Sequence, residues 1–300
     1  MLEGPLSISM ELRSLPETDN RIILWRNTIQ LFHRYKKNKF NGPFFDAGYT
    51  TYRVESPLSE KNTGTELHPD IFACGPNGWL VIELSCNDKS KCHQLDKYRN
   101  LDSRSLALYG CEPYDNPPDT ISSRLSMNND GNHCEMIVKE TFHLNKDEYI
   151  QNDNLREALI QMRGKSLRGL PEIPFSLVPE MKHYEIRRGL IDIVMQLFDG
   201  SSEGKTPYQM CEDALERLFP LVTTTAKKSL VEKIKSEMEP LVKKELNGYL
   251  IYQDGKYIAT DKYKQSPQSR NRIASKLQEW ANPSQRRLLD FHAATDVTED

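Results

Sequence analysis

The sequence predicts an α/β domain with a mixed sheet flanked by helices, followed by a smaller α+β domain. Helical and strand-like segments alternate through the first half of the chain, which is typical of an α/β layer. The stretch from Gly164 to Pro179 holds two glycines and three prolines, which interrupt regular structure and indicate a linker at 166–180. The second half has helical patterns and then two strands around Asp254-Gly255, a strong signal for a two-residue hairpin.

The elements of the first domain, residues 1–165, follow from apolar spacing and turn residues. The run 79–84 is almost entirely apolar and predicts a strand that is buried on both faces. It follows the strand 70–74 across the turn Gly75-Pro76-Asn77-Gly78. The other expected elements are a helix capped by Thr18 or Asp19, strands at 51–55, 105–109 and 135–142, helices at 88–101 and 147–162, and a long loop over 113–130.

The second domain, residues 181–263, combines three helices with a hairpin. Thr206, Pro207 and Gln209 form the pattern of a capping box with proline in the first turn, so a helix should begin there. Helices are expected at 184–198, 207–219 and 225–246, and strands at 249–252 and 256–260. This order predicts a winged-helix-like domain. Residues 264–300 should hold one more helix, around 272–280, and an acidic tail that we expect to be mobile.

Composition and charge narrow the classes of protein. The chain of 300 residues has 37% hydrophobic residues, no apolar run of the roughly 20 residues that a membrane span requires, and no signal-peptide pattern. We therefore expect a cytoplasmic protein without a membrane partner. The net charge of −3 means that binding to nucleic acid has to come from local patches. The six cysteines show no disulfide framework, and we expect most of them to be reduced.

Two acids lie at the ends of neighbouring predicted strands, Asp70 and Glu83. Side chains two residues apart in a strand share a face, so Glu83 and Ser85 point the same way. Two carboxylates are typical ligands of Mg²⁺, which polarises a phosphate and activates a water. A positive charge usually completes such a site, because negative charge develops on the phosphate during cleavage. Ser85 lies where that charge would fit, and it carries none.

These residues resemble the motifs of the PD-(D/E)XK nuclease superfamily, over roughly residues 18–162. Pro69-Asp70 matches the first half-motif, Glu83-Leu84-Ser85 matches the second with serine in place of lysine, and Gln94 with Tyr98 matches the QxxxY element. The resemblance implies cleavage of nucleic acid with Mg²⁺ or Mn²⁺, with Asp70 and Glu83 as metal ligands. No clear first-helix glutamate, an extra ligand in some branches, is found.

A lysine on the helix after Glu83 could replace the missing charge. At about 100° per residue, Lys91 lies about 60° from Gln94 and about 20° from Tyr98, which makes it the best candidate. Lys97 and Lys139 are the alternatives. His68 could also reach the metal centre, whereas the spacing of Cys86, Cys92 and His93 is not that of a common zinc site.

The third helix of the second domain carries lysines that could contact DNA phosphates: Lys227, Lys228, Lys243 and Lys244. Glutamates alternate with them, so the same helix could instead serve a protein partner. We therefore expect a Mg²⁺-dependent DNA endonuclease of restriction, phage defence or repair. The alternatives are a catalytically inactive nuclease-fold subunit that binds DNA or protein, and a nuclease subunit that acts only within a complex. The sequence does not specify the oligomeric state, and a dimer is one of the states it allows.

Overall fold

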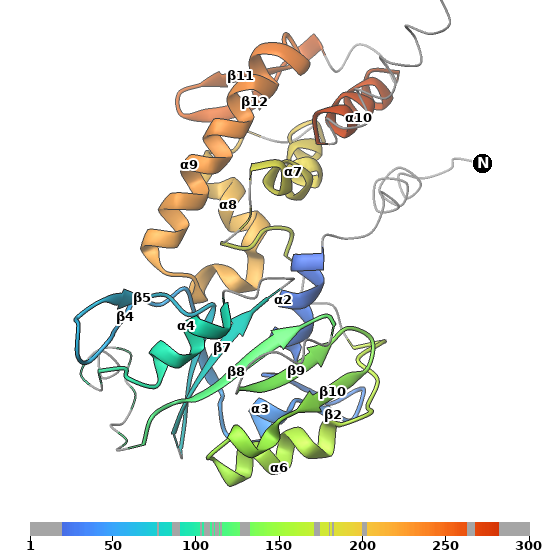
Figure 1. Cartoon of the computed structure of the whole chain (residues 1–300). Helices are drawn as coiled ribbons and strands as arrows, with labels where there is room; N and C mark the ends of the chain where they lie inside the picture. The colour runs from blue at the N-terminus through green and yellow to red at the C-terminus, as the bar shows by residue number, and fades with distance from the viewer. Residues whose placement is uncertain are drawn as a thin grey trace, which may run out of the picture. The chain divides into compact units, whose positions relative to one another are not determined.

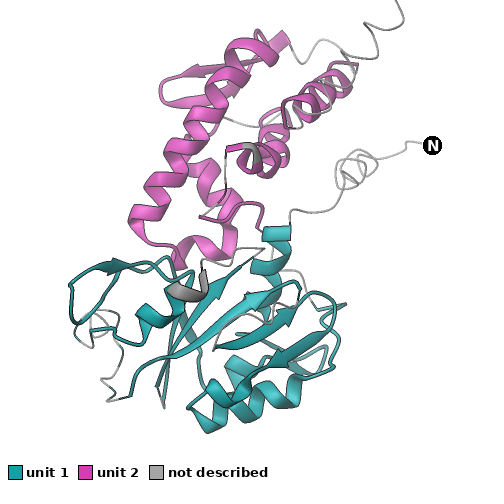
Figure 2. Ribbon diagram, in the orientation of Figure 1, with its two compact units in different colours: residues 1–173 teal, residues 174–300 magenta. Residues whose placement is uncertain are grey.

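The structure is a computed structural model. It describes residues 20–76, 78–85, 91–102, 104, 109, 111, 114, 116–126, 133–170, 175–179, 181, 183–199, 203–262 and 268–281. The chain divides into two compact units, residues 1–173 and 174–300 (Figure 2). This division falls inside the segment 166–180, in which we expected the linker. None of the described helices has the length and apolar character that crossing a membrane requires.

Unit 1 is a mixed α/β layer around a six-stranded sheet with the strand order β10-β9-β8-β7-β6-β3 (Figure 1). The central neighbours β7, β8 and β9 are parallel, and the other pairs are antiparallel. The sheet strands are β3 (Thr51–Val54), β6 (Ile71–Gly75), β7 (Gly78–Leu84), β8 (Asp119–Arg124), β9 (Cys134–Val138) and β10 (Phe142–Asn145). Two small hairpins join β1 (Arg34–Tyr35) to β2 (Phe40–Asn41) and β4 (Leu58–Ser59) to β5 (Glu66–Leu67).

Helices cover both faces of this sheet. Thr28 of α2 forms a buried hydrogen bond of 2.8 Å with Ser123 of β8. Tyr98 of α4 binds Glu83 of β7, whose partner in β8 is the preceding residue. Successive residues of a strand point to opposite faces, so α2 and α4 lie on opposite sides. The helices of unit 1 are α2 (Asn20–Gln30), α3 (Pro43–Asp46), α4 (Lys91–Tyr98) and α6 (Asp153–Met162), with a 3₁₀ turn at Asp147–Tyr149.

The core on the α4 side explains why the strand 79–84 is so apolar. Trp79 and Val81 of β7 pack with Phe72 of β6 against Leu95 and Tyr98 of α4. On the other face, the alternate residues of β7 are also buried. A central strand that is covered by helices on both sides needs apolar residues at nearly every position.

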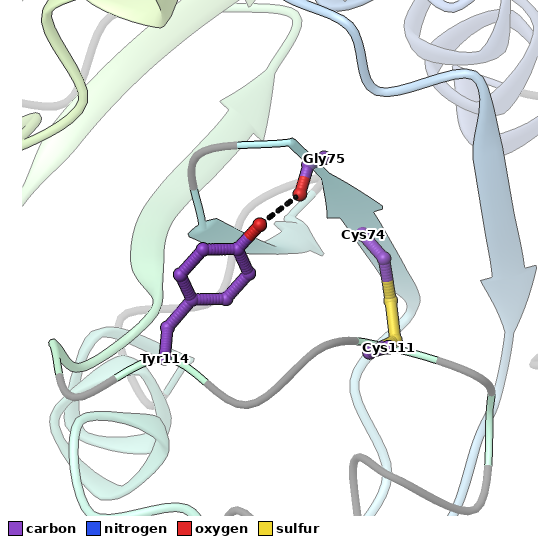
Figure 3. The surroundings of a disulfide bond; sticks show 4 residues. All are labelled: Cys74, Gly75, Cys111 and Tyr114. Carbon is purple, nitrogen blue, oxygen red and sulfur yellow. Dashed lines mark hydrogen bonds between the residues drawn. A yellow bond between two sulfur atoms is a disulfide. The ribbon is translucent and has the colours of Figure 1, made fainter.

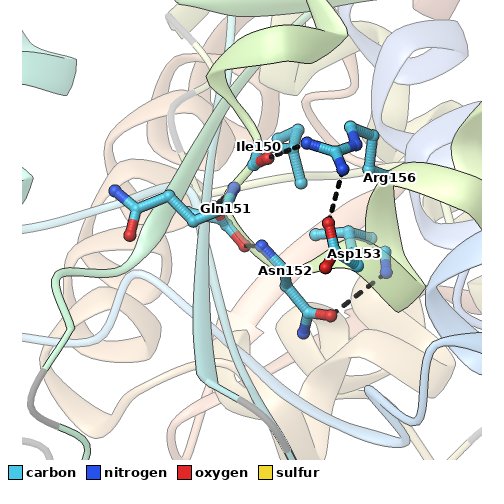
Figure 4. Close-up of polar contacts among 7 residues, drawn as sticks. Ile150, Gln151, Asn152, Asp153 and Arg156 are labelled. Carbon is cyan, nitrogen blue, oxygen red and sulfur yellow. Dashed lines mark hydrogen bonds and ion pairs between the residues drawn. The ribbon is translucent and has the colours of Figure 1, made fainter.

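The start of α6 is fixed by side chains from two elements (Figure 4). Asn152 caps the helix by accepting a hydrogen bond from the backbone N–H of Leu155. Arg156 pairs with Asp153 one turn earlier. Asp119, at the start of β8, accepts the backbone N–H of Asn152 and of the residue before it. These contacts tie α6 to the middle of the sheet.

Cys74 and Cys111 form a disulfide that the sequence did not indicate, whereas Cys134 and Cys211 are free thiols (Figure 3). The Cα atoms of the disulfide pair are 5.8 Å apart, and the hydroxyl of Tyr114 donates to the carbonyl of Gly75 alongside. The two bonded cysteines are 37 residues apart in the sequence. They become neighbours only because the chain returns to the β6–β7 hairpin, which no local spacing indicates.

Three predicted elements of unit 1 differ from the structure. The segment 113–130 was expected to be a loop, but it contains the buried strand β8. The strand expected at 135–142 is two strands, β9 and β10, joined by a tight turn. The helix expected at 147–162 is the 3₁₀ turn followed by α6. Of the strand expected at 105–109, only Tyr109 lies within the described residues, where it is in a turn.

Unit 2 has the predicted sequence of helices followed by a hairpin. Its elements are α7 (His183–Leu197), α8 (Pro207–Leu215), a 3₁₀ helix (Glu216–Leu221), α9 (Thr224–Pro240), a π-helical turn (Leu241–Glu245), β11 (Leu250–Gln253), β12 (Lys256–Ala259) and α10 (Gln268–Ala281). The capping box is confirmed, since Thr206 and Gln209 exchange both hydrogen bonds. Residues 18 and 19, where the first cap was predicted, and 282–300, where a mobile tail was predicted, lie outside the described residues.

The hairpin of unit 2 has the turn that its sequence predicts. Asp254 and Gly255 both have positive φ, 51° and 78°, as a type I′ turn requires. Lys205, between α7 and α8, forms an isolated antiparallel bridge with Tyr257 of β12. Its N–H donates to the Tyr257 carbonyl, and its carbonyl accepts the Tyr257 N–H. The hairpin is thus attached to the helices by backbone hydrogen bonds.

Candidate functional site

Asp70 and Glu83 lie opposite each other at the end of the β6–β7 pair. The ladder of β6 and β7 ends at the pair Ile71 and Ile82, and Asp70 and Glu83 are the residues one step beyond this pair. Side chains at paired positions share a face, with Cβ atoms about 4.5–5.5 Å apart. Both acids are buried, with 2% and 1% of their surface exposed. One oxygen of Asp70 accepts the backbone N–H of Leu84 at 2.5 Å, which fixes its carboxylate against β7.

Helix α4 holds the Glu83 carboxylate through two side chains one turn apart. The buried Tyr98 hydroxyl donates to Glu83 Oε1 at 2.6 Å. The Gln94 amide donates to the Tyr98 hydroxyl oxygen at 3.1 Å. Burial, reinforced by the nearby Glu83 carboxylate, raises the pKa of Tyr98 far above its ordinary value. Tyr98 therefore stays a proton donor to Glu83 at every pH at which the protein would be used.

The row of polar side chains continues into β8 and β9. Glu83 pairs with Ser122 of β8, and Ser122 pairs with Glu135 of β9. Arg124, two residues beyond Ser122, turns back along β8. Its Nε lies 3.0 Å from Ser122 Oγ and 3.1 Å from Glu135 Oε1. These side chains are all buried, and together with the buried Asp70, which immediately precedes β6, they form a polar strip on the α4 face that reaches from β6 to β9.

Ser85 lies at the same end of this strip. Its N–H donates to the Ser123 carbonyl at 3.0 Å, which extends the β7–β8 ladder one residue past Leu84. This step brings Ser85 beside Arg124, on the face that carries Glu83. The position that lacks the expected lysine therefore has an arginine next to it on the neighbouring strand.

The structure describes the side chains of two of the three predicted replacement lysines. Lys91 begins α4, and its side chain lies outside the described residues. Lys97 is exposed on α4, and Lys139 is exposed in the turn after β9. His68 forms an ion pair with the exposed Glu66 at 2.7 Å. None of these observations brings Lys97, Lys139 or His68 to the acids.

A hard divalent cation suits the pair of acids. Two buried carboxylates in neighbouring positions repel each other unless a positive charge lies close. Within the described parts of the chain, no three His, Cys, Asp or Glu side chains are grouped as metal ligands. Mg²⁺ is commonly held by one or two carboxylates, with waters and substrate phosphate oxygens as the other ligands. Asp70 and Glu83 fit this type of site.

The predicted DNA-contacting lysines of unit 2 are of two kinds. Lys227 lies 4.2 Å from the centre of the Phe219 ring, and Lys243 pairs with Glu239 at 2.6 Å. Lys228 and Lys244 are exposed and form no ion pair with any residue that the structure describes. Only the second kind has its charge available to a partner without breaking a contact.

Sequence reasoning missed Ser122, Arg124 and Glu135. The segment 119–124 contains a single aliphatic residue, Ile121, and it follows a stretch rich in proline and aspartate. Its composition is therefore that of a loop, although the strand is buried between β7 and β9. The available signal was a charged residue, Arg124, closing a short run that contains β-branched residues.

Comparison of this chain with protein-family models, with curated proteins and with solved structures finds no match.

Proposed function

We propose that unit 1 is a metal-dependent nuclease that hydrolyses DNA phosphodiester bonds. The observation that carries the proposal is the buried pair Asp70 and Glu83 on paired strands, with Tyr98 and Gln94 behind Glu83. Gln94, Tyr98 and Glu83 form one chain of hydrogen bonds, and the Asp70 carboxylate is held beside them by the backbone N–H of Leu84. The mixed sheet with helices on both faces is compatible with a nuclease-type domain of the PD-(D/E)XK kind.

Each residue of the group has a role in this proposal. Asp70 and Glu83 would hold Mg²⁺ or Mn²⁺, which when bound would polarise the phosphate and lower the pKa of a water. Tyr98 fixes the orientation of the Glu83 carboxylate, and Gln94 fixes Tyr98. The backbone of Leu84 fixes Asp70. Such preorganised groups pay no reorganisation cost at the moment of reaction.

We further propose that unit 2 is a winged-helix-like domain that binds DNA. The order α7, Lys205 bridge, α8, α9 and β11–β12 hairpin supports this, because the third helix and the hairpin are the parts that contact DNA in such folds. Lys228 and Lys244 offer exposed charge for phosphates.

The second candidate function is a catalytically inactive nuclease-fold subunit that binds DNA or a protein. Two observations favour it: the uncharged Ser85 at the motif position, and the pairing of Lys235 of α9 and Lys243 of the following π-helical turn with glutamates. The two candidates differ in whether any cleavage occurs.

The test incubates the purified chain with plasmid, linear duplex and single-stranded DNA and Mg²⁺ or Mn²⁺. Asp70→Asn and Glu83→Gln should each lower the cleavage rate by on the order of 10²-fold or more, because each removes a charged ligand. Asparagine is preferred to alanine at position 70, since it keeps an acceptor for the Leu84 N–H. Glu66→Gln, an exposed acid of the same unit, is the matched control and should cut at the wild-type rate.

Calorimetric titration with Mn²⁺ separates the outcomes. The wild type should bind Mn²⁺, and both site variants should bind it more weakly. Wild-type cleavage by Asp70→Asn would show that the site is assigned wrongly. A wild type that binds DNA but cuts no nucleic acid with either metal would support the inactive subunit.

A further inference from the structure

We infer that Arg124 supplies, from strand β8, the positive charge that Ser85 does not supply from β7. This inference rests on the proposed nuclease function and names the residue that contacts the phosphate being cut.

The register of the sheet brings Arg124 to the acids. Ser122 is the direct partner of Glu83, and parallel neighbours are about 4.8 Å apart. Arg124 Nε lies 3.0 Å from Ser122 Oγ, so the side chain folds back over β8. Arg124 lies two residues after Ser122, so its side chain is on the sheet face that carries Glu83, on the strand next to β7.

The charge balance of the strip gives Arg124 a role beyond its ion pair. A buried guanidinium is stable only if it is paired, and Glu135 provides one partner at 3.1 Å. The strip holds three buried carboxylates, Asp70, Glu83 and Glu135, against this one buried arginine. The pair with Glu135 leaves the two facing acids for a divalent cation. Arg124 would then lie near a cation held by Asp70 and Glu83, and it would not compete with that cation for their carboxylates.

The chemistry of arginine suits the role. The planar guanidinium presents several N–H donors in a fixed fork that matches phosphate oxygens. Arg124 Nε donates to Ser122 Oγ and forms the ion pair with Glu135, and these two contacts fix the orientation of the guanidinium. A phosphate held by a cation between Asp70 and Glu83 would lie next to Ser85, and Arg124 is the neighbour of Ser85 in the ladder. Charge that develops on the phosphate oxygens would be stabilised there.

The test uses the full chain with the Arg124→Met/Glu135→Gln double variant. It removes both members of the buried pair, so no uncompensated charge is left in the core. Its Mn²⁺ binding should be retained, while its cleavage rate at saturating DNA should fall by on the order of 10²-fold. Arg156→Met, which breaks an exposed arginine pair elsewhere in unit 1, is the control.

Rescue distinguishes a contact with the phosphate from a structural role. Adding Ser85→Lys to the double variant should restore part of the rate, because it returns the charge to the adjacent strand. Methylguanidinium should partly rescue Arg124→Ala/Glu135→Gln, and it should leave the Asp70→Asn variant inactive. A structural role would show neither rescue.

The possible failures are distinct. If the wild type cuts and the double variant cuts equally fast, or if neither rescue occurs, Arg124 does not have this role while the nuclease function stands. A wild type that cuts no nucleic acid overturns the nuclease proposal and this inference together.

Discussion

At the scale of single residues, the site is a chain of donors that runs in one direction. Gln94 donates to Tyr98, and Tyr98 donates to Glu83. Because the phenol of Tyr98 is fully buried, its hydroxyl has no competing water to bind. The Glu83 carboxylate is therefore held in one orientation before any substrate arrives.

Replacing Tyr98 with phenylalanine should test this chain of donors. The variant loses a hydrogen bond to a carboxylate, which should lower the free energy of unfolding by about 1.5–3 kcal/mol. It should also weaken Mn²⁺ binding, since Glu83 is no longer oriented. Urea unfolding and calorimetry measure the two effects. Unchanged values for both would show that Tyr98 contributes only packing.

The pKa of Tyr98 adds a pH dependence with a definite sign. Its pKa is raised in the folded state by burial and by Glu83, whereas in the unfolded chain it is about 10. Below about pH 10 the phenol is protonated in both states, so its contribution to stability is complete. As the pH rises above that value, only the unfolded chain loses the proton, and stability falls. Tyr98→Phe should show a smaller loss over the same range.

Which site residues the sequence reveals depends on how local their signal is. Asp70, Glu83, Gln94 and Tyr98 lie within 29 positions on consecutive elements, so their grouping follows from one hairpin and one helix. Arg124 joins them through parallel pairing of β7 with β8 across an intervening helix. No pattern in a single strand states which strand will lie beside it.

At the scale of elements, the disulfide closes a loop that contains two elements of the candidate site. The loop between Cys74 and Cys111 contains β7 and α4, and with them Glu83, Gln94 and Tyr98. A cross-link of this kind stabilises the fold mainly by restricting the unfolded chain.

Removing this disulfide should therefore lower stability by an amount set by loop length. For 37 residues the chain-entropy relation gives about 4 kcal/mol, for either reduction or the Cys74→Ser/Cys111→Ser variant. Urea unfolding with and without a reductant measures it. The double variant is its own control, because a reductant should not change its stability. Equal stability of oxidised and reduced wild type would contradict the prediction.

Prediction of elements from sequence was best where burial and local pattern agree. Strand β7 and the β11–β12 hairpin are confirmed, because one is apolar on both faces and the other has a specific turn. Strand β8 was missed because its neighbours on both sides, and not its own apolar residues, hold it in the sheet. Its backbone hydrogen bonds are local in space but distant in sequence.

At the scale of the whole molecule, the net charge of −3 means that the proposed DNA binding would depend on a few exposed cations. Lys228→Gln/Lys244→Gln should weaken duplex binding and reduce the slope of log K against log salt by about 1.8, since each phosphate contact contributes about 0.9. Lys235→Gln/Lys243→Gln removes the same charge from lysines that are already paired with glutamates, and it should have a smaller effect. Fluorescence anisotropy over a salt series measures both. Equal effects of the two variants would assign DNA contact elsewhere in the chain.

The polar strip of unit 1 reaches from β6 to β9, with its members between Asp70 and Glu135 in the sequence. Pairings between distant strands form late in folding, because the entropy of closing the intervening loops must be overcome before the contacts stabilise it. Its buried charges are tolerable only when all partners are present, so a half-assembled strip is less stable than none. The site is thus a property of the finished sheet, and a kinetic intermediate of unit 1 with β6, β7 and α4 already formed would have the motif residues in place but not their charge balance.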